Sequence, residues 1–276
     1  MAQLNGTWRP GFGEVQRAFE RNFVDHGEVG ASVCVTVNGE TVVDLWGGTV
    51  AARTDAATVE EPTVEEPTAE EATAWEADTL VTVFSCTKGA TAICAHVLAD
   101  AGKLDLDAPV GDYWPEFATN GKEHATVRMM LDHSVGVPTW REKLPAGSVY
   151  DWDYMVGRLE AEEPFWEPGT RHGYHMLSFG WTVGELVRRA SGRSLGAVLA
   201  EVAAKVGNVG GPPSVEQGPA DFFIGLPESQ EHRVSRVIPF LPDTAHPTHM
   251  TLAVRANRKS VTALRSEERR VGKECA

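Results

Sequence analysis

Apolar residues recur with a helical period in several parts of the chain. After residue 87 the apolar positions form a strong helical face, and Gly102 follows as a typical C-terminal stop. The residues on that face are Ala90, Ile93, Cys94, Val97, Leu98 and Ala101. A weaker pattern near the N-terminus, formed by Val15, Ala18, Phe19 and Phe23, predicts an amphipathic helix.

Three further helices are predicted in the second half of the chain. One begins at Val127–Leu131, and a second passes through Trp181, Gly184 and Val187. Ser194 is placed to cap the third. The buried face of this third helix would consist of Leu195, Val198, Leu199 and Val202. The aromatic-rich region between the first two helices, from Trp140 to Trp166, is expected to be irregular.

Strand patterns complete an α+β composition. Two β-rich runs, 31–37 and 40–46, flank the turn pair Asn38-Gly39, which is a strong β-hairpin signal. A short apolar run, 222–226, predicts another strand, and the residues from 239 to 247 predict a polar loop.

The composition changes abruptly between the hairpin and residue 80. Residues 59–73 form a degenerate five-residue repeat rich in glutamate, and residues 49–80 hold nine acidic residues against one arginine, Arg53. With Trp75 as almost its only large apolar residue, the segment cannot offset the entropy lost on ordering. We therefore expect 49–79 to be a solvated, low-complexity insertion in the globular domain. An acidic interaction loop is the alternative.

The whole-chain composition narrows the possible partners. The 276 residues can bury a sizeable core, and the net charge of −14 argues against nucleic acid or an anionic membrane as a partner. No stretch approaches a membrane span, and the first residues lack the basic and apolar regions of a signal peptide. The four cysteines show no C-x-x-C spacing, and Cys34 and Cys94 occupy apolar positions. These features predict a cytoplasmic protein with reduced, packing cysteines, and they indicate no particular oligomeric state.

The first candidate for chemistry is Ser85, at the junction between an apolar run and the strong helix. A serine in the first turn of a helix lies beside unpaired backbone N–H groups and the positive end of the dipole. Lys88 lies three residues later on the same face, where a lysine held neutral could accept the serine proton. A chance Ser-x-x-Lys, with a capping serine and a solvated lysine, is the competing interpretation. This is, however, the only Ser-x-x-Lys in the chain.

Two further blocks follow in order: His133-x-x-Gly136-Val137-Pro138, and Pro168-Gly169-Thr170 four residues before Tyr174. With Ser85-x-x-Lys88, these blocks make residues 10–250 resemble the class C β-lactamase-like serine hydrolases. This superfamily includes penicillin-binding proteins, D-alanyl-D-alanine carboxypeptidases and the family VIII esterases. The segments 84–89, 173–175 and 180–181 are most similar to the esterase branch.

The resemblance implies a fold and catalytic roles. The fold would be β-lactamase/transpeptidase-like, with an antiparallel sheet, flanking helices and a helical subdomain. Ser85 would attack a carbonyl, Lys88 would take or polarise its proton, and Tyr174 would relay a proton to the leaving group. The Ser85 N–H would give one oxyanion donor, while His133 and Gly136 would serve turn and packing roles. No cofactor is implied, and no metal, because His172 and His175 lack an evident third ligand.

Met176 bears on the substrate. The β-lactamases and carboxypeptidases of this superfamily have Tyr-x-Asn where this chain has Tyr174-x-Met176. The departure favours a small-molecule carboxylic ester with an apolar acyl group over a β-lactam or a peptide. The predicted binding residues are Trp140, Trp152, Trp166 and Met176. Activity like that of a β-lactamase or a D-alanyl-D-alanine carboxypeptidase, or a catalytically incomplete scaffold, are the alternatives.

The C-terminal part departs further from the family. The third block, Lys-Thr-Gly or His-x-Gly, has no convincing match after Tyr174. The resemblance therefore implies that C-terminal strands, with the second oxyanion donor, are missing. Residues 265–275 resemble a translated sequencing adapter. We thus expect an incomplete domain over 1–264 and a non-native tail over 265–276, with a charged, frayed natural terminus as the alternative.

Overall fold

The computed structural model describes residues 3–50, 73–206 and 219–238. The chain divides into two compact units. Of the described residues, the first unit contains 3–50, 73–82, 203–206, 219–221 and 225–238. The second contains 83–202 and 222–224. The predicted loop at 239–247 and the tail at 265–276 lie outside the described residues.

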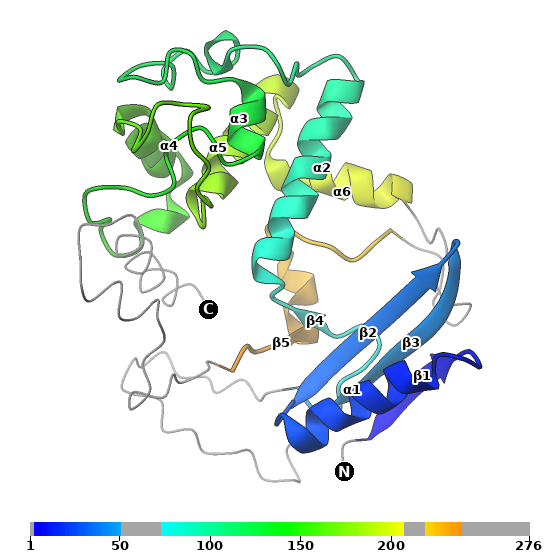
Figure 1. The fold of residues 1–276 in the computed structure, drawn as a ribbon. Coiled ribbons are helices and arrows are strands. Elements are labelled where there is room, and N and C mark those ends of the chain that lie inside the picture. The colour runs from blue at the N-terminus through cyan, green and yellow to red at the C-terminus, as the bar shows by residue number, and fades with distance from the viewer. Residues whose placement is uncertain (1–2, 51–72, 207–218, 239–276) are drawn as a thin grey trace. The chain divides into compact units, whose positions relative to one another are not determined.

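The first unit is built on an antiparallel sheet in the order β1-β3-β2 (Figure 1). The predicted hairpin is confirmed as β2 (Gly30–Val37) and β3 (Glu40–Gly48). Asn38 and Gly39 both have positive φ, 52° and 80°, as a tight two-residue hairpin turn requires. The edge strand β1 (Leu4–Trp8) was not predicted, because its apolar residues stand only at its two ends.

The predicted N-terminal helix is α1 (Gly13–Asp25), which packs against this sheet. Of the four residues that defined its apolar face, only Phe19 is buried. Phe19 forms a small core with Val42, Val43 and Leu45 of β3. The hydrophobic core of this unit is therefore small in the part of the chain that the structure describes.

Both described ends of the predicted acidic insertion are held by backbone hydrogen bonds. The Val50 N–H donates to the Thr73 carbonyl, and the Trp75 N–H donates to the Gly48 carbonyl. The Trp75 ring is only 5% exposed and lies against Gly30. The residues between these ends, 51–72, lie outside the described residues, so the insertion stays a prediction there.

The predicted strand at 222–226 is wrong. This segment has an irregular backbone, and Phe222 and Ile224 pack against the helical core of the second unit. Gly225 adopts a φ of 84°, which breaks an extended run. The short strand nearby is β5 (Val234–Ser235), which pairs in parallel with β4 (Leu80–Val81).

The second unit is helical (Figure 1). Its helices are α2 (Thr87–Asp100), α3 (Val127–Leu131), α4 (Trp152–Ala161), α5 (Ser178–Ser191) and most of α6 (Leu195–Val206). The core lies around α2 and α5, where Cys94 and Leu98 share one cluster with Phe179 and Val183. The helices predicted at Val127, around Trp181 and after Ser194 are confirmed.

Helix α4 corrects the expectation of an irregular aromatic region. The Asp151 carboxylate accepts a hydrogen bond from the Tyr154 N–H, 3.0 Å away, and so caps the helix. Met155, Val156 and Leu159 then form its buried face. The cap and the apolar spacing were both present in the sequence, but the surrounding aromatic residues obscured them.

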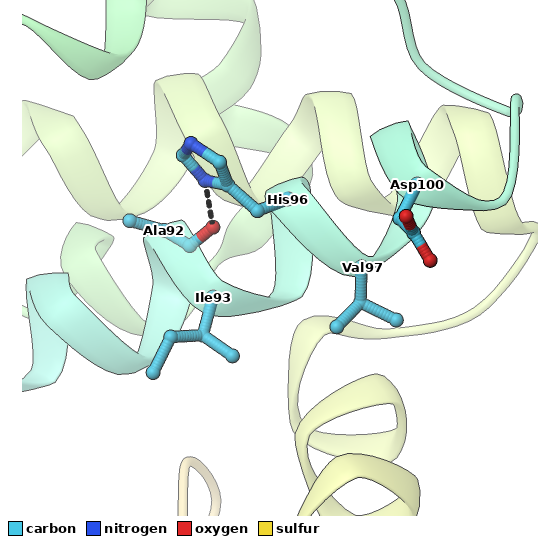
Figure 2. A pocket seen from close by; sticks show the side chains of 5 residues that line it. All are labelled: Ala92, Ile93, His96, Val97 and Asp100. Atoms are coloured by element: carbon cyan, nitrogen blue, oxygen red, sulfur yellow. Dashed lines mark hydrogen bonds between the residues drawn. The ribbon is translucent and has the colours of Figure 1, made fainter.

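The buried face of α2 is narrower than predicted. Ala90, Cys94 and Leu98 are buried, whereas Ile93 and Val97 are 52% and 40% exposed. Figure 2 shows Ile93 and Val97 in a surface pocket that is also lined by Ala92, His96 and Asp100. The predicted stop is confirmed, because Gly102 has a φ of 67° and the next residue donates its N–H to the Leu98 carbonyl.

One of the two cysteines that were predicted to pack in the core is buried. Cys94 is buried, as predicted for a packing residue, but Cys34 is exposed. Alternation along β2 turns the Cys34 side chain away from the small core. Among the described residues, no helix has the length and apolar character needed to cross a membrane.

Candidate active site

Ser85 lies in a strained turn that leads directly into α2. The turn is a short 3₁₀ segment, Phe84–Cys86, so Ser85 precedes the α-helix rather than standing in its first turn. Phe84 has a φ of 45°, in the left-handed region that side chains other than glycine rarely adopt. Ser85 is exposed. The local backbone therefore presents the serine hydroxyl at the surface of the helical unit.

Lys88 reaches the serine, as the three-residue spacing predicts. Its Nζ donates a hydrogen bond to Ser85 Oγ over 3.2 Å and another to the Met176 carbonyl oxygen over 2.6 Å. The lysine side chain is partly buried. A neutral amine has two hydrogens and one lone pair. After loss of a proton, the amine can keep its bond to the Met176 carbonyl and turn its lone pair, in place of the donated N–H, toward the serine hydroxyl.

Tyr174 completes the predicted trio. Its ring centre lies 4.8 Å from Lys88 Nζ, within cation–π distance, and the Phe179 ring centre lies 5.8 Å away from the same nitrogen. Tyr174 is 37% exposed. The structure thus brings Ser85, Lys88 and Tyr174 together, although Lys88 and Tyr174 are 86 positions apart in the chain.

The segment around Tyr174 rests on the 133–137 turn. The Gly173 N–H donates to the His133 carbonyl over 3.1 Å, and Ser178 Oγ donates to the Val137 carbonyl over 2.8 Å. Gly136 has a φ of 89°, and a Cβ there would lie 2.5 Å from the Trp166 carbonyl oxygen. Only glycine fits that position, which agrees with the turn role expected for it.

The predicted binding tryptophans lie in different places. Trp140 is 3% exposed and packs edge-on against Trp181, and the Trp152 Nε1–H donates to the Glu185 carboxylate over 2.9 Å. Trp166 contacts the loop that carries Tyr174: its Nε1–H donates to the Ser134 carbonyl and its ring closely covers Gly173. The structure therefore brings Trp166 and the Met176 carbonyl to the neighbourhood of the trio, and places Trp140 and Trp152 in the helical core.

His175 is a site residue for which the sequence suggested no catalytic role. It is fully buried, and its ring bonds with the backbone on both sides: Nδ1 lies 2.7 Å from the Gly173 carbonyl oxygen, and Nε2 accepts from the Val137 N–H over 3.2 Å. Its position beside Tyr174 was the available signal. Within the described ranges, no group of three histidine, cysteine or acidic side chains is arranged to hold a metal ion.

Comparisons with known proteins place this chain in a family. Residues 15–249 match the model of the β-lactamase family. The esterase/β-lactamase LipL of Mycobacterium tuberculosis is 34% identical over 196 residues, which are 71% of this chain and 41% of LipL. Esterase EstB of Burkholderia gladioli is 31% identical over 140 residues, 44% of this chain and 35% of EstB.

Solved structures agree with this placement. A family VIII carboxylesterase superposes with a TM-score of 0.71 at 40% identity, over 86% of this chain and 58% of that one. A penicillin-binding protein homologue from Caulobacter crescentus gives 0.72 at 32% identity, over 89% and 58%. The chain thus spans about four-tenths to six-tenths of the length of LipL and of these two structures. A class C β-lactamase at 20% identity shares the fold, with a TM-score of 0.55. The chain therefore belongs to the β-lactamase family and has its α+β, β-lactamase/transpeptidase-like fold.

Proposed function

We propose that this protein hydrolyses carboxylic esters through an acyl-enzyme on Ser85. The observation that carries the proposal is the contact between Ser85 Oγ and Lys88 Nζ at 3.2 Å, with the amine held by the Met176 carbonyl. A serine hydroxyl needs an adjacent base to become a nucleophile, and this contact supplies one. The names of the relatives, which include esterases and a family VIII carboxylesterase, support the same activity.

Acylation would use all three residues of the trio. As Ser85 Oγ bonds to the ester carbonyl carbon, its proton passes to neutral Lys88, and the carbonyl electrons move to the oxygen. The Ser85 N–H would donate a hydrogen bond to that oxyanion. When the intermediate collapses, Tyr174 gives its proton to the departing alcohol and recovers one from Lys88. Deacylation repeats these steps with water as the nucleophile, and it releases the acid and free Ser85.

The acyl group would lie on apolar residues near Ser85. Phe84 is 66% exposed beside the nucleophile, and Met176 is partly buried next to Lys88. Trp166 covers Gly173, one residue before Tyr174. We propose these residues as the acyl-binding side of the site. Trp140 and Trp152 would then act through the core, because one is buried and the other bonds to Glu185.

Cleavage of β-lactams is the second candidate activity. The printed name of LipL carries both activities, and the Caulobacter neighbour is a penicillin-binding protein homologue. Met176, in place of the amide-binding asparagine of the Tyr-x-Asn block, favours the ester. A methionine side chain cannot supply the hydrogen bonds that an asparagine gives to an amide substrate.

A steady-state assay of the full chain tests the proposal. We expect turnover of p-nitrophenyl butyrate, with a kcat/KM at least tenfold above that for nitrocefin, and loss of turnover in Ser85→Ala. Ser229→Ala removes an exposed hydroxyl of the other unit and serves as the matched control. Ester turnover that survives in Ser85→Ala contradicts the assignment. Wild-type protein that is acylated once without turnover would instead favour an incomplete site.

Two smaller proposals concern the partner and the compartment. The partner would be a small-molecule ester rather than nucleic acid or a membrane. We also propose the cytoplasm as the place of action, where Cys34 and Cys86, both exposed, would remain thiols. Fractionation of the producing cells followed by detection of the protein in each fraction checks this location.

A further inference from the structure

Two histidines from different segments of the chain contact each other beside Tyr174. His133 lies in the turn before Gly136, and His175 lies between Tyr174 and Met176. The His175 backbone N–H donates to His133 Nδ1 over 3.1 Å, and the two rings stack with centres 5.4 Å apart. The His133 ring also packs against Tyr174, with centres 5.0 Å apart. We call this pair of residues the histidine clasp.

The hydrogen bonds define the proton positions on both rings. A backbone N–H can only donate, and a carbonyl can only accept. His175 Nε2 accepts from the Val137 N–H, so it carries a lone pair, and Nδ1 carries the hydrogen that it donates to the Gly173 carbonyl. His133 Nδ1 likewise carries a lone pair, because it accepts from the His175 N–H. Both rings are therefore neutral when these bonds are made.

The clasp makes hydrogen bonds to the short stretch 173–176 on both sides of Tyr174. His133 accepts from the Gly173 N–H through its carbonyl and from the His175 N–H through its ring. His175 bonds to Val137, and the adjoining Met176 carbonyl accepts from Lys88 Nζ. The backbone that carries Tyr174 and the carbonyl that binds the Lys88 amine are therefore both connected to the same pair of histidines.

We propose that His133 and His175 are positioning residues for the reaction. They hold Tyr174 and the Met176 carbonyl at the positions that the contacts with Lys88 require. The inference rests on the proposed ester hydrolysis. Catalytic groups work only when their neighbours lock them within a fraction of an ångström, and a misplacement of about 1 Å can cost about 100-fold in rate. His133 therefore does more than fill the turn that its φ of 68° suits.

Paired substitutions separate positioning from packing. His175→Gln keeps an oxygen that can accept from Val137, whereas His175→Leu keeps the size and removes the acceptor. At position 133, asparagine and glycine both tolerate the left-handed backbone, but only asparagine can accept from the His175 N–H. We expect His175→Leu and His133→Gly to lower kcat about 100-fold with KM nearly unchanged. His175→Gln and His133→Asn should recover at least tenfold of that loss.

Two control variants show how kcat responds to the loss of an unrelated histidine and to the loss of core packing. His96→Ala removes an exposed histidine of α2, whose ring bonds only one turn back to Ala92 (Figure 2), and should keep the wild-type kcat. Leu159→Ala truncates a fully buried residue of α4 and lowers the Tm without touching the clasp. If Leu159→Ala lowers kcat as much as His133→Gly at a similar loss of Tm, the role is packing and the proposal is overturned. Equal kcat values within the Asn/Gly and Gln/Leu pairs overturn it too.

The nitrogen chemical shifts of the two histidine rings, measured by NMR, test the clasp independently of the proposed function. The ring nitrogen shifts of His175 in wild-type protein should show the Nδ1–H tautomer, and those of His133 the Nε2–H tautomer. These shifts do not depend on turnover. Wild-type protein without ester turnover contradicts the proposed function. An Nε2–H tautomer for His175 contradicts the clasp itself, whether or not the enzyme is active.

Discussion

At the scale of single residues, the candidate site depends on one local contact and one distant one. The Ser85–Lys88 contact follows from a three-residue spacing at a helix start, so the sequence alone predicts it. The approach of Tyr174 depends on how α2, the 133–137 turn and the 173–176 stretch pack, and only the order of the family's blocks pointed to it. The role of His175 could not be predicted in this way, because its contacts to His133 and Val137 bridge about 40 residues.

Replacing Lys88 tests the proposed base. Lys88→Met keeps the length of the side chain and removes the amine, so we expect kcat to fall about 10²–10⁴-fold with little change in KM. Lys103→Met, an exposed lysine just after α2, is the control. Circular dichroism of both variants checks that they are folded. A kcat within threefold of wild type in Lys88→Met would exclude the lysine as the base.

Replacing Gly136 tests the turn beneath the site. An alanine there would bring its Cβ to 2.5 Å from the Trp166 carbonyl oxygen at a positive φ. We expect Gly136→Ala to lower the free energy of unfolding by about 2 kcal/mol or more, measured by denaturant titration. Gly147→Ala, at a positive φ but with open space around its Cβ, should cost less. If the free energy of unfolding falls equally in the two variants, the close approach to Trp166 does not contribute to the cost of the substitution.

At the scale of elements, local signals succeeded where one short motif decides the structure. Asn38-Gly39 predicted the hairpin, Gly102 predicted the end of α2, and Ser194 predicted the start of α6, with its Oγ 3.2 Å from the Ala197 N. The strand prediction at 222–226 was wrong because the apolar side chains of this run are buried against the helical core without strand pairing. Periodicity cannot distinguish these two outcomes for a run of five residues.

Helices α4 and α5 are joined by a buried carboxylate. Glu185 is fully buried, and burial would raise the pKa of its carboxyl group. Hydrogen bonds from Arg188, Trp152 and Arg189 outweigh burial and lower the pKa below the usual value of 4.5. The ionised group therefore stabilises the fold above that value, and this stability is lost as the pH falls through the lowered pKa.

Glu185→Gln tests this buried carboxylate. We expect the free energy of unfolding at neutral pH to fall by about 2 kcal/mol, less than for a fully buried pair because both arginines are partly exposed. Below pH 4.5, wild-type stability should fall more steeply than that of the variant. Glu201→Gln, in an exposed pair with Arg193, should cost under about 1 kcal/mol. Parallel pH profiles for wild type and Glu185→Gln would contradict the assigned ionisation.

At the scale of the whole molecule, the two units differ in how much core they hold. Among the described residues, the main cluster of the sheet unit has four buried apolar residues and that of the helical unit has twenty-five. Composition predicted that a sizeable core could form, but the division into units depends on contacts far apart in the chain. The candidate site lies within the unit that has the larger core.

Hydrogen exchange tests this imbalance. Local opening costs least where few apolar contacts are buried, so the amides of β2 should exchange faster than those of α5 in the native protein. Mass spectrometry of deuterated peptides from the full chain measures both. The same protection in the two elements would mean that the sheet unit is as stable as the helical unit.

Covalent labelling of the full chain most directly tests the central claim that Ser85 is the nucleophile. The wild-type protein is treated with a fluorophosphonate, digested and mapped by mass spectrometry, with Ser85→Ala and Ser229→Ala treated in parallel. The account predicts one adduct, on Ser85, in the wild type and in Ser229→Ala, and none in Ser85→Ala. An unmodified Ser85 in the wild type, or equal labelling of Ser85→Ala, would contradict it.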